Sequence, residues 1–305
     1  MIDKELNKKS NKLAINGVYR PFTPYSVLFA SGEDAVEFVQ GQVTQDISNL
    51  KQGEMAYAFL LTQKGRVVGD LYVIQESAES VILVSWSMTP VEMVDRLEAY
   101  IIADDVELVD ETADWAGWQV AGSAAVTWGQ EWVKKMGSNV IGWREPVPLG
   151  SGSFCLLTKE DPAWPEHIRE GLAEDFERAR LEAGVPRVPV DLGPTDFPQE
   201  AGQEKVGVSF TKGCYLGQEV MARLETTGRI RRRLFRVSGV GKAPEEGLAE
   251  LKQGERVVGE LRSRISGGVD EWQGLAMLNV AHLDTAREVE LGEGLVVRVA
   301  EAISD

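Results

Sequence analysis

Few residues of this chain can bind a metal or form a cross-link. Its 305 residues include two cysteines, Cys155 and Cys214, and two histidines, which lack a partner at metal-ligand spacing. Two cysteines cannot build a disulfide framework, or the four-ligand site of a structural zinc ion or an iron–sulfur cluster. We therefore expect no resident metal, and we expect reduced thiols in a cytoplasmic protein.

Long apolar runs and an excess of basic residues are also absent. No apolar run approaches the roughly 18 residues that predict a membrane-spanning helix, and the polar residues 1–11 do not resemble a secretory signal. The chain carries 32 basic and 48 acidic residues, which give a formal net charge of −16 and a pI near 4.7. Such a charge repels nucleic-acid phosphates. We expect neither membrane attachment nor direct nucleic-acid binding.

The sequence pattern divides the chain into three regions. Residues 1–12 have no apolar pattern and are predicted to form a polar tail. Residues 13–230 mix helical and strand-like segments, whereas residues 231–305 consist of short strand-like runs between turns. The last region is therefore predicted to be a small β-barrel. A chain of 305 residues is long enough for two or three domains.

Local signals predict several elements in the mixed region. Two strand-like segments around a short turn predict a β-hairpin of residues 56–61 and 66–74. The segment Thr89–Glu92 combines a cap, a proline and a capping-box glutamate, and it predicts a helix start. Residues 124–128 are predicted to form a strand. A further helix is predicted after Pro165, from the apolar stripe of Ile168, Leu172, Phe176 and Ala179.

Side chains with reactive or hydrogen-bonding groups are most concentrated in the segment Lys212-Gly213-Cys214-Tyr215-Leu216-Gly217-Gln218-Glu219. Its two glycines allow a sharp turn or a close backbone approach. From Tyr215 the apolar spacing predicts a helix that ends at Thr227-Gly228. Cys214 would then lie near a helix start with Lys212 beside it, an environment that activates a thiol. The alternative from spacing alone is that Cys214 is a small buried hydrophobe.

This segment resembles the signature of the YgfZ family of folate-binding proteins, relatives of the glycine-cleavage T-protein. Three further segments carry the resemblance: Gln40-Gly41-Gln42-Val43-Thr44, Arg180–Pro186 and Pro198–Gly202. The resemblance implies an α+β, GcvT-like fold with three lobes around a folate funnel. Two interleaved α/β subdomains would occupy residues 13–230, and a C-terminal β-barrel would occupy residues 231–305.

The resemblance also implies a function. It predicts a protein that binds tetrahydrofolate, or a one-carbon folate derivative, and supports iron–sulfur cluster assembly or repair in client enzymes, including tRNA-modifying ones. Cys214 would be the functional thiol, with Lys212 and Glu219 tuning or orienting it. The loop would be shaped by Gly213, Tyr215, Gly217 and Gln218. The expected partners are folate and iron–sulfur client or assembly proteins, and the expected state is a monomer.

The predicted folate contacts follow from the same resemblance. T-proteins have Asp-Asp-Leu where this chain has Gly69-Asp70-Leu71, and a glutamate that hydrogen-bonds the pteridine ring matches Glu200. Arg223 would shape the pocket, and Tyr25 and Phe176 would lie near the folate rings. The alternative function is an aminomethyltransferase that transfers a one-carbon unit to tetrahydrofolate. The loss of one acid at Gly69 argues against it. A third alternative is an interaction module that binds no folate.

A basic cluster follows the cysteine segment in this acidic chain. Its members are Arg229, Arg231, Arg232, Arg233 and Arg236. Guanidinium groups suit a polyglutamate tail, a phosphate or an RNA backbone. The same residues could equally be a solvated strand edge that resists aggregation. Both interpretations stay open on the sequence.

Overall fold

The computed structural model describes residues 17–145, 152–245, 247, 249–268, 270–284, 288–291 and 295–303. The predicted polar tail, residues 1–12, lies outside the described residues. Contacts divide the chain into two compact units. The first unit comprises Met1–Gln42, Asp46–Ala58 and Asp70–Ala179, and the second comprises Val43–Gln45, Phe59–Gly69 and Arg180–Asp305.

The first unit contains a five-stranded sheet with the order β10-β1-β7-β9-β8. The pair β1–β10 is parallel and the other pairs are antiparallel. Its strands are β1 (Val18–Phe22), β7 (Ala116–Ala121), β8 (Val140–Arg144), β9 (Ser153–Thr158) and β10 (Arg169–Glu170). β9 is buried along its whole length, so the centre of this sheet forms part of the core.

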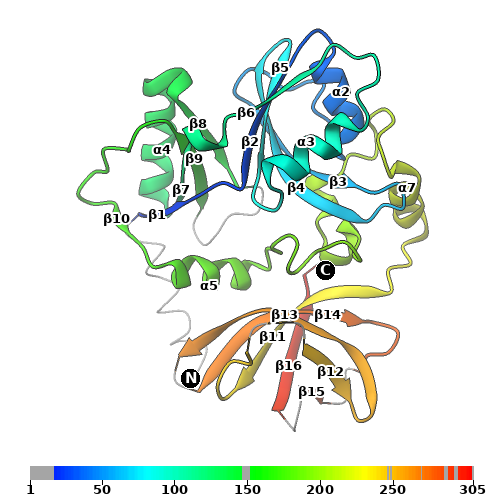
Figure 1. The fold of residues 1–305 in the computed structure, drawn as a ribbon. Helices are drawn as coiled ribbons and strands as arrows, with labels where there is room; N and C mark the ends of the chain where they lie inside the picture. Colours follow the sequence, from blue (N-terminus) through cyan, green and yellow to red (C-terminus); the bar gives the residue numbers. More distant parts are fainter. Residues whose placement is uncertain are drawn as a thin grey trace. The chain divides into compact units, whose positions relative to one another are not determined.

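A second five-stranded sheet has the order β3-β4-β5-β2-β6. Its strands are β2 (Ser26–Ser31), β3 (Met55–Leu61), β4 (Val67–Ser77), β5 (Ser80–Ser85) and β6 (Glu107–Asp110). The chain enters the first sheet with β1, builds the second with β2 to β6, and then returns to the first (Figure 1). This path confirms the predicted interleaving. The predicted hairpin is also confirmed, as β3 and β4.

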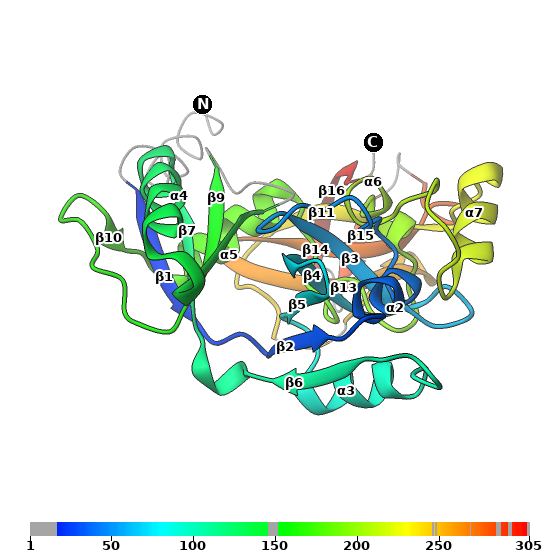
Figure 2. The same ribbon diagram turned by 90° about the horizontal axis from the view of Figure 1, so that it is seen from above.

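Three helices of the first unit pack on its strands: α2 (Ala35–Gln42), α3 (Pro90–Glu98) and α4 (Ser123–Met136). Helix α5 (Ala173–Ala183) begins in the first unit and ends in the second. The first unit also has the 3-10 turns η1 (Thr112–Asp114) and η2 (Gly137–Asn139). α4 packs on β7, β8 and β9, and α3 runs beside β6 (Figures 1 and 2). The predicted capping box is confirmed. The Glu92 N–H donates to Thr89 Oγ1 over 3.3 Å, and the Thr89 N–H donates to Glu92 Oε2 over 2.8 Å.

Two predicted elements were wrong. Residues 124–128 belong to helix α4 instead of a strand, and α4 buries Ala125, Val126 and Gly129 on one face. A short apolar run fits either structure, so its length could not decide between them. The helix predicted after Pro165 begins only at Ala173. Arg169 pairs with Val18 in β10 instead, because a long-range strand pairing prevails there over local periodicity.

The second unit contains the closed barrel β11-β14-β13-β12-β15-β16, which confirms the predicted C-terminal barrel. Its strands are β11 (Arg232–Val240), β12 (Ala249–Gln253), β13 (Arg256–Gly268), β14 (Glu271–Asn279), β15 (Val289–Leu291) and β16 (Leu295–Ala302). Trp272 is fully buried in its core with Leu251 and Leu261. A Cβ at Gly239 would lie 2.4 Å from Trp272 Nε1, so only glycine fits beside that ring.

Candidate functional site

The cysteine loop joins two helices of the second unit, α6 (Glu204–Gly207) and α7 (Gln218–Thr227). Within this loop Lys212 and Tyr215 are buried, whereas Gly213 and Cys214 are exposed. Two buried side chains therefore hold a short exposed segment between them. The structure presents the Cys214 thiol to solvent.

Lys212 fastens the loop to a distant part of the chain. Its side-chain ammonium donates hydrogen bonds to the backbone carbonyls of Val43, over 2.8 Å, and Gln45, over 3.0 Å. It also lies 5.2 Å from the centroid of the Tyr215 ring. Thr44 Oγ1 donates to the Gly207 carbonyl beside this anchor. Two of the segments that carried the resemblance thus meet in space, and Lys212 positions the loop.

The two glycines of the loop differ in the space around them and in whether the backbone conformation requires glycine. Gly217 has a φ of 89°, and a Cβ there would lie 2.8 Å from the Thr62 carbonyl oxygen. A Cβ at Gly213 would have no heavy atom within 4 Å beyond its chain neighbours. The predicted sharp turn and close approach therefore apply to Gly217. Gln218 Nε2 lies 3.5 Å from the Gly213 carbonyl oxygen and closes the loop.

Helix α7 begins later than its spacing predicts. The spacing predicts a start at Tyr215, but the helix starts at Gln218, after Gly217 in the left-handed conformation. Cys214 consequently lies in the loop before the helix and not at its first turn. The predicted end is confirmed, because Gly228 caps the helix with a φ of 58°. Glu219 is exposed in the first turn.

The second cysteine has the opposite environment. Cys155 lies on β9 in the first unit, is fully buried, and donates from Sγ to Glu145 Oε1 over 2.7 Å. Burial raises the pKa of the Cys155 thiol well above its ordinary value, and the nearby Glu145 charge raises it further. Cys155 is therefore a neutral core thiol. Of the two cysteines, Cys214 is the one that a ligand or partner can reach.

Asp70 lies in the first unit within a small buried network. Tyr57 Oη donates to its Oδ2 over 2.9 Å, and Ser87 Oγ donates to its Oδ1 over 2.6 Å. Burial raises the pKa of Asp70, although both hydrogen bonds act to lower it. The sequence reasoning missed Tyr57 and Ser87. Tyr57 could have been found from the predicted hairpin, because its two strands contain Tyr57 and Asp70.

The other predicted folate contacts are divided between the two units. Tyr25 and Phe176 belong to the first unit, where the Tyr25 side chain is 61% exposed and Phe176 is 1% exposed. The Arg20 guanidinium lies 5.2 Å from the centroid of the Phe176 ring. Glu200 and Arg223 belong to the second unit, and the structure brings these two to one pocket.

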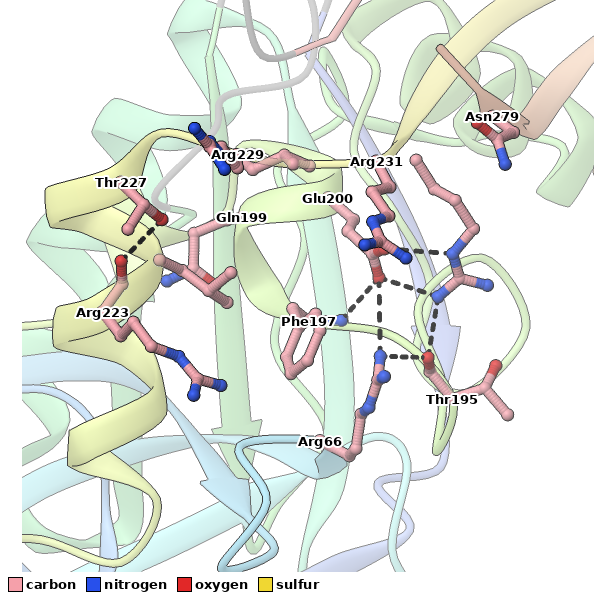
Figure 3. Close-up of a pocket in the computed structure, with 13 residues that line it drawn as sticks. Arg66, Thr195, Phe197, Gln199, Glu200, Arg223, Thr227, Arg229, Arg231 and Asn279 are labelled. Carbon is pink, nitrogen blue, oxygen red and sulfur yellow. Dashed lines mark hydrogen bonds and ion pairs between the residues drawn. The ribbon is translucent and has the colours of Figure 1, made fainter. Parts of the chain in front are cut away.

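This pocket has a volume of about 610 Å³ and is rich in arginine (Figure 3). Its lining includes Arg66, Arg223, Arg229, Arg231, Arg232, Phe197 and Glu200. Glu200 is buried in the 3-10 turn η3 (Pro198–Ala201). Arg232 donates from Nε to its Oε1 over 3.0 Å and from Nη2 to its Oε2 over 2.9 Å, and the Phe197 N–H donates to Oε2 over 2.8 Å. Both carboxylate oxygens are thus engaged.

The basic cluster predicted from the sequence separates in space. Arg229, Arg231 and Arg232 line the pocket. Arg236 donates from Nη1 to the Glu182 carbonyl oxygen over 2.9 Å, and so it supports the end of α5. Arg233 is not among the residues that line the pocket. Arg233 follows Arg232 on β11, and consecutive side chains on a strand point to opposite faces, which accounts for its separation from Arg232.

Comparisons with known proteins support the resemblance. Residues 24–143 match the family model described as the GCVT N-terminal domain, and residues 231–302 match the CAF17 C-terminal β-barrel domain. The human mitochondrial iron–sulfur cluster assembly factor IBA57 is 30% identical over 299 residues, which cover 92% of this chain and 82% of the human protein. The chain belongs to the family of IBA57 and YgfZ. The tRNA-modifying protein YgfZ of Klebsiella pneumoniae is 26% identical over 246 residues, which cover 74% of this chain and 73% of that protein.

A solved structure shows the same fold as this IBA57 and YgfZ relative. The glycine cleavage system aminomethyltransferase T from Bartonella henselae aligns with a TM-score of 0.79, covering 98% of this chain and 89% of that protein. The identity is 16%. The alignment therefore confirms the predicted GcvT-like fold and carries no statement about activity.

Two features are absent from the described residues of this IBA57 and YgfZ family member. In the part of the chain that the structure describes, no helix is long and apolar enough to cross a membrane. The same residues contain no group of three or more histidine, cysteine, aspartate or glutamate side chains that could hold a metal ion.

Proposed function

We propose that this protein supports the assembly or repair of iron–sulfur clusters in client enzymes, and that Cys214 is its functional thiol. The observation that carries the proposal is the contrast between the two cysteines. Cys214 is exposed on a loop anchored by the buried Lys212, whereas Cys155 is buried in the first unit. The names of IBA57 and YgfZ as an iron–sulfur cluster assembly factor and a tRNA-modifying protein supply the class of client.

The chemistry available to one exposed thiol is limited and specific. After loss of its proton to solvent, the Cys214 sulfur can donate an electron pair to one iron of a client's cluster. Iron–sulfur clusters usually require four thiolate ligands, so the client must supply the others. A transient contact with a client's cluster is therefore the role we assign to Cys214, with the cluster as cargo.

We also propose that the protein binds tetrahydrofolate or a one-carbon derivative of it. When bound, such a folate would supply or accept a one-carbon unit. The residues around Asp70 fit a pterin, because a buried carboxylate can accept hydrogen bonds from the ring N–H and amino groups. Tyr57 and Ser87 hold the Asp70 side chain in one orientation. Tyr25, Phe176 and Arg223 remain proposed contacts.

Glu200 fits its predicted role less well. The partners of Asp70 are neutral hydroxyl groups, whereas Glu200 accepts two hydrogen bonds from the charged Arg232 guanidinium and one from the Phe197 N–H. A pteridine ring would have to compete with this ion pair for the Glu200 oxygens. We therefore assign Glu200 to the positioning of Arg232. This leaves Asp70 as the carboxyl group on which folate recognition depends.

Rescue of a bacterial strain that lacks its YgfZ relative tests the role of Cys214. We expect Cys214→Ala to fold, to keep its affinity for tetrahydrofolate, and to fail to restore the activity of iron–sulfur enzymes. The matched control is Cys155→Ala, which removes the other thiol and should still restore that activity. Full rescue by Cys214→Ala would exclude the proposed role.

Titration with tetrahydrofolate, followed by tryptophan fluorescence, tests the folate proposal. We expect saturable binding by the wild type and weakened binding by Asp70→Asn. Absence of binding up to millimolar folate would favour an interaction module instead. A glycine-cleavage assay with a lipoyl-bearing carrier protein separates the remaining alternative, since ordinary turnover there would identify an aminomethyltransferase.

A further inference from the structure

The arginine-lined pocket of the second unit collects its positive charge from separate segments of the chain. Arg66 follows the turn between β3 and β4, Arg223 lies on α7, and Arg229 and Arg231 lie in the segment that leads to β11, where Arg232 begins the strand. Glu200 is the one acidic residue among the described lining residues. The lining therefore has a surplus of four positive charges, although the whole chain carries −16.

Two of these five arginines hold the pocket together. Arg232 forms ion pairs with Glu200 and Asp196, each over 2.9 Å. Arg66 lies with its guanidinium carbon 3.7 Å from the centroid of the Phe197 ring and with Nη1 4.0 Å from Glu200 Oε2 (Figure 3). These contacts satisfy the buried carboxylates. They leave no acidic group of the described lining available for the other arginines.

Among the residues that the structure describes, the remaining three arginines have no such partner. Among the described residues, the guanidinium groups of Arg223, Arg229 and Arg231 make no hydrogen bond or ion pair that the structure records. All three are exposed at a cavity of about 610 Å³, a size that holds a small ligand. Like charges held around one cavity repel each other and attract a counter-ion of opposite charge.

We infer that this pocket binds a small polyanion, a ligand with two or more adjacent phosphate or carboxylate groups. The planar guanidinium fork donates two parallel hydrogen bonds to either group. Several arginines around one cavity favour a ligand with several anionic groups over a single anion. Phosphate chains and oligoglutamate chains share this chemistry. The inference does not depend on the proposed function, because it needs neither the Cys214 thiol nor a pterin ring.

Isothermal titration calorimetry at low salt with two probes tests the inference. The probes are inorganic tripolyphosphate and γ-linked triglutamate, neither of which carries a pterin. We expect at least one of them to bind, and the tighter of the two identifies the natural class. The double variant Arg229→Gln with Arg231→Gln should weaken that binding by about tenfold or more, with unchanged circular dichroism.

A control double variant separates binding in the pocket from nonspecific electrostatic attraction of the anionic probe to the protein. Arg256 and Arg298 are exposed barrel residues outside the pocket lining. Arg256→Gln with Arg298→Gln removes the same charge and should leave the affinity for the probe within about twofold. Binding of neither probe, or equal weakening by both double variants, would overturn the inference. Because folate titration of the same variants is a separate measurement, failure here leaves the folate proposal intact.

Discussion

At the scale of single residues, the two cysteines differ in what surrounds their sulfur atoms. Burial raises the pKa of the Cys155 thiol and shields it, whereas Cys214 is exposed. Thiol alkylation requires an accessible thiolate. We expect native protein to incorporate about one equivalent of iodoacetamide at Cys214, with Cys155 modified only after denaturation. Peptide mass spectrometry gives the site, and native labelling of both cysteines at similar rates would contradict the burial contrast.

Lys212 can be tested as an anchor of the loop. Replacement by methionine keeps an apolar stem and removes the hydrogen bonds to the carbonyls of Val43 and Gln45. A buried acceptor left without a donor costs about 1–3 kcal/mol. We expect Lys212→Met to lower the stability of the second unit by that amount in urea unfolding. Lys242→Met, at an exposed position of the same unit, should have little effect, and equal stability of the two variants would argue against the anchor.

The buried Asp70 carboxyl group makes the stability of the folded protein depend on pH. Burial raises the pKa of Asp70, so the folded state binds more protons than the unfolded state between the two pKa values. Its contribution to stability is therefore complete below the unfolded pKa of about 4 and is lost as pH rises through the folded pKa. We expect the stability of Asp70→Asn relative to wild type to increase from pH 4 to neutral pH. Urea unfolding over a pH series measures this difference.

The exposed Asp95 in the same unit provides the control for loss of one negative charge. Asp95→Asn should show a much smaller change with pH in its difference from wild type. A difference between Asp70→Asn and wild type that is constant over the pH series would show that burial of the carboxylate does not carry the effect.

At the scale of elements, the cysteine loop offers a matched pair of glycines. A Cβ at Gly217 would meet the Thr62 carbonyl oxygen at 2.8 Å, and the left-handed φ of 89° is itself unfavourable for alanine. Such strain costs about 1–3 kcal/mol. We expect Gly217→Ala to destabilise the second unit by about that amount or more, and Gly213→Ala to change it by less than about 1 kcal/mol. Chemical unfolding compares them, and similar losses would contradict the assigned difference.

The sequence predicted correctly those elements that are determined by residues close together in the chain. The capping box at Thr89, the hairpin of β3 and β4, the Gly228 helix end and the barrel strands all follow from nearby residues. The late start of α5 was not predictable in this way, because β10 forms only by pairing with the distant β1. Similarly, the arginine pocket unites Arg66 with Arg229 through the fold. The sequence identified a basic cluster but could not show which of its members face one cavity.

At the scale of the whole molecule, the division into two units predicts how the protein unfolds. The described residues form one apolar core cluster within the first unit and another within the barrel. Val120 and Leu156 belong to the core of the first unit, and Leu251 and Trp272 to that of the barrel. Chains of this size with more than one core commonly unfold through populated intermediates. We therefore expect two transitions in urea, one for each unit.

Hydrogen exchange with mass spectrometry along the urea titration can assign these transitions. Peptides from β7 and β9 should lose protection together at one midpoint, and peptides from β13 and β14 should do so at another. The Trp272→Phe variant provides the matched perturbation, because this side chain is buried in the barrel core and truncation of a large core side chain is destabilising. It should lower the midpoint of the barrel peptides and leave that of the β7 and β9 peptides nearly unchanged. Coincident midpoints that shift together in the variant would instead mean that the two units unfold as one cooperative structure.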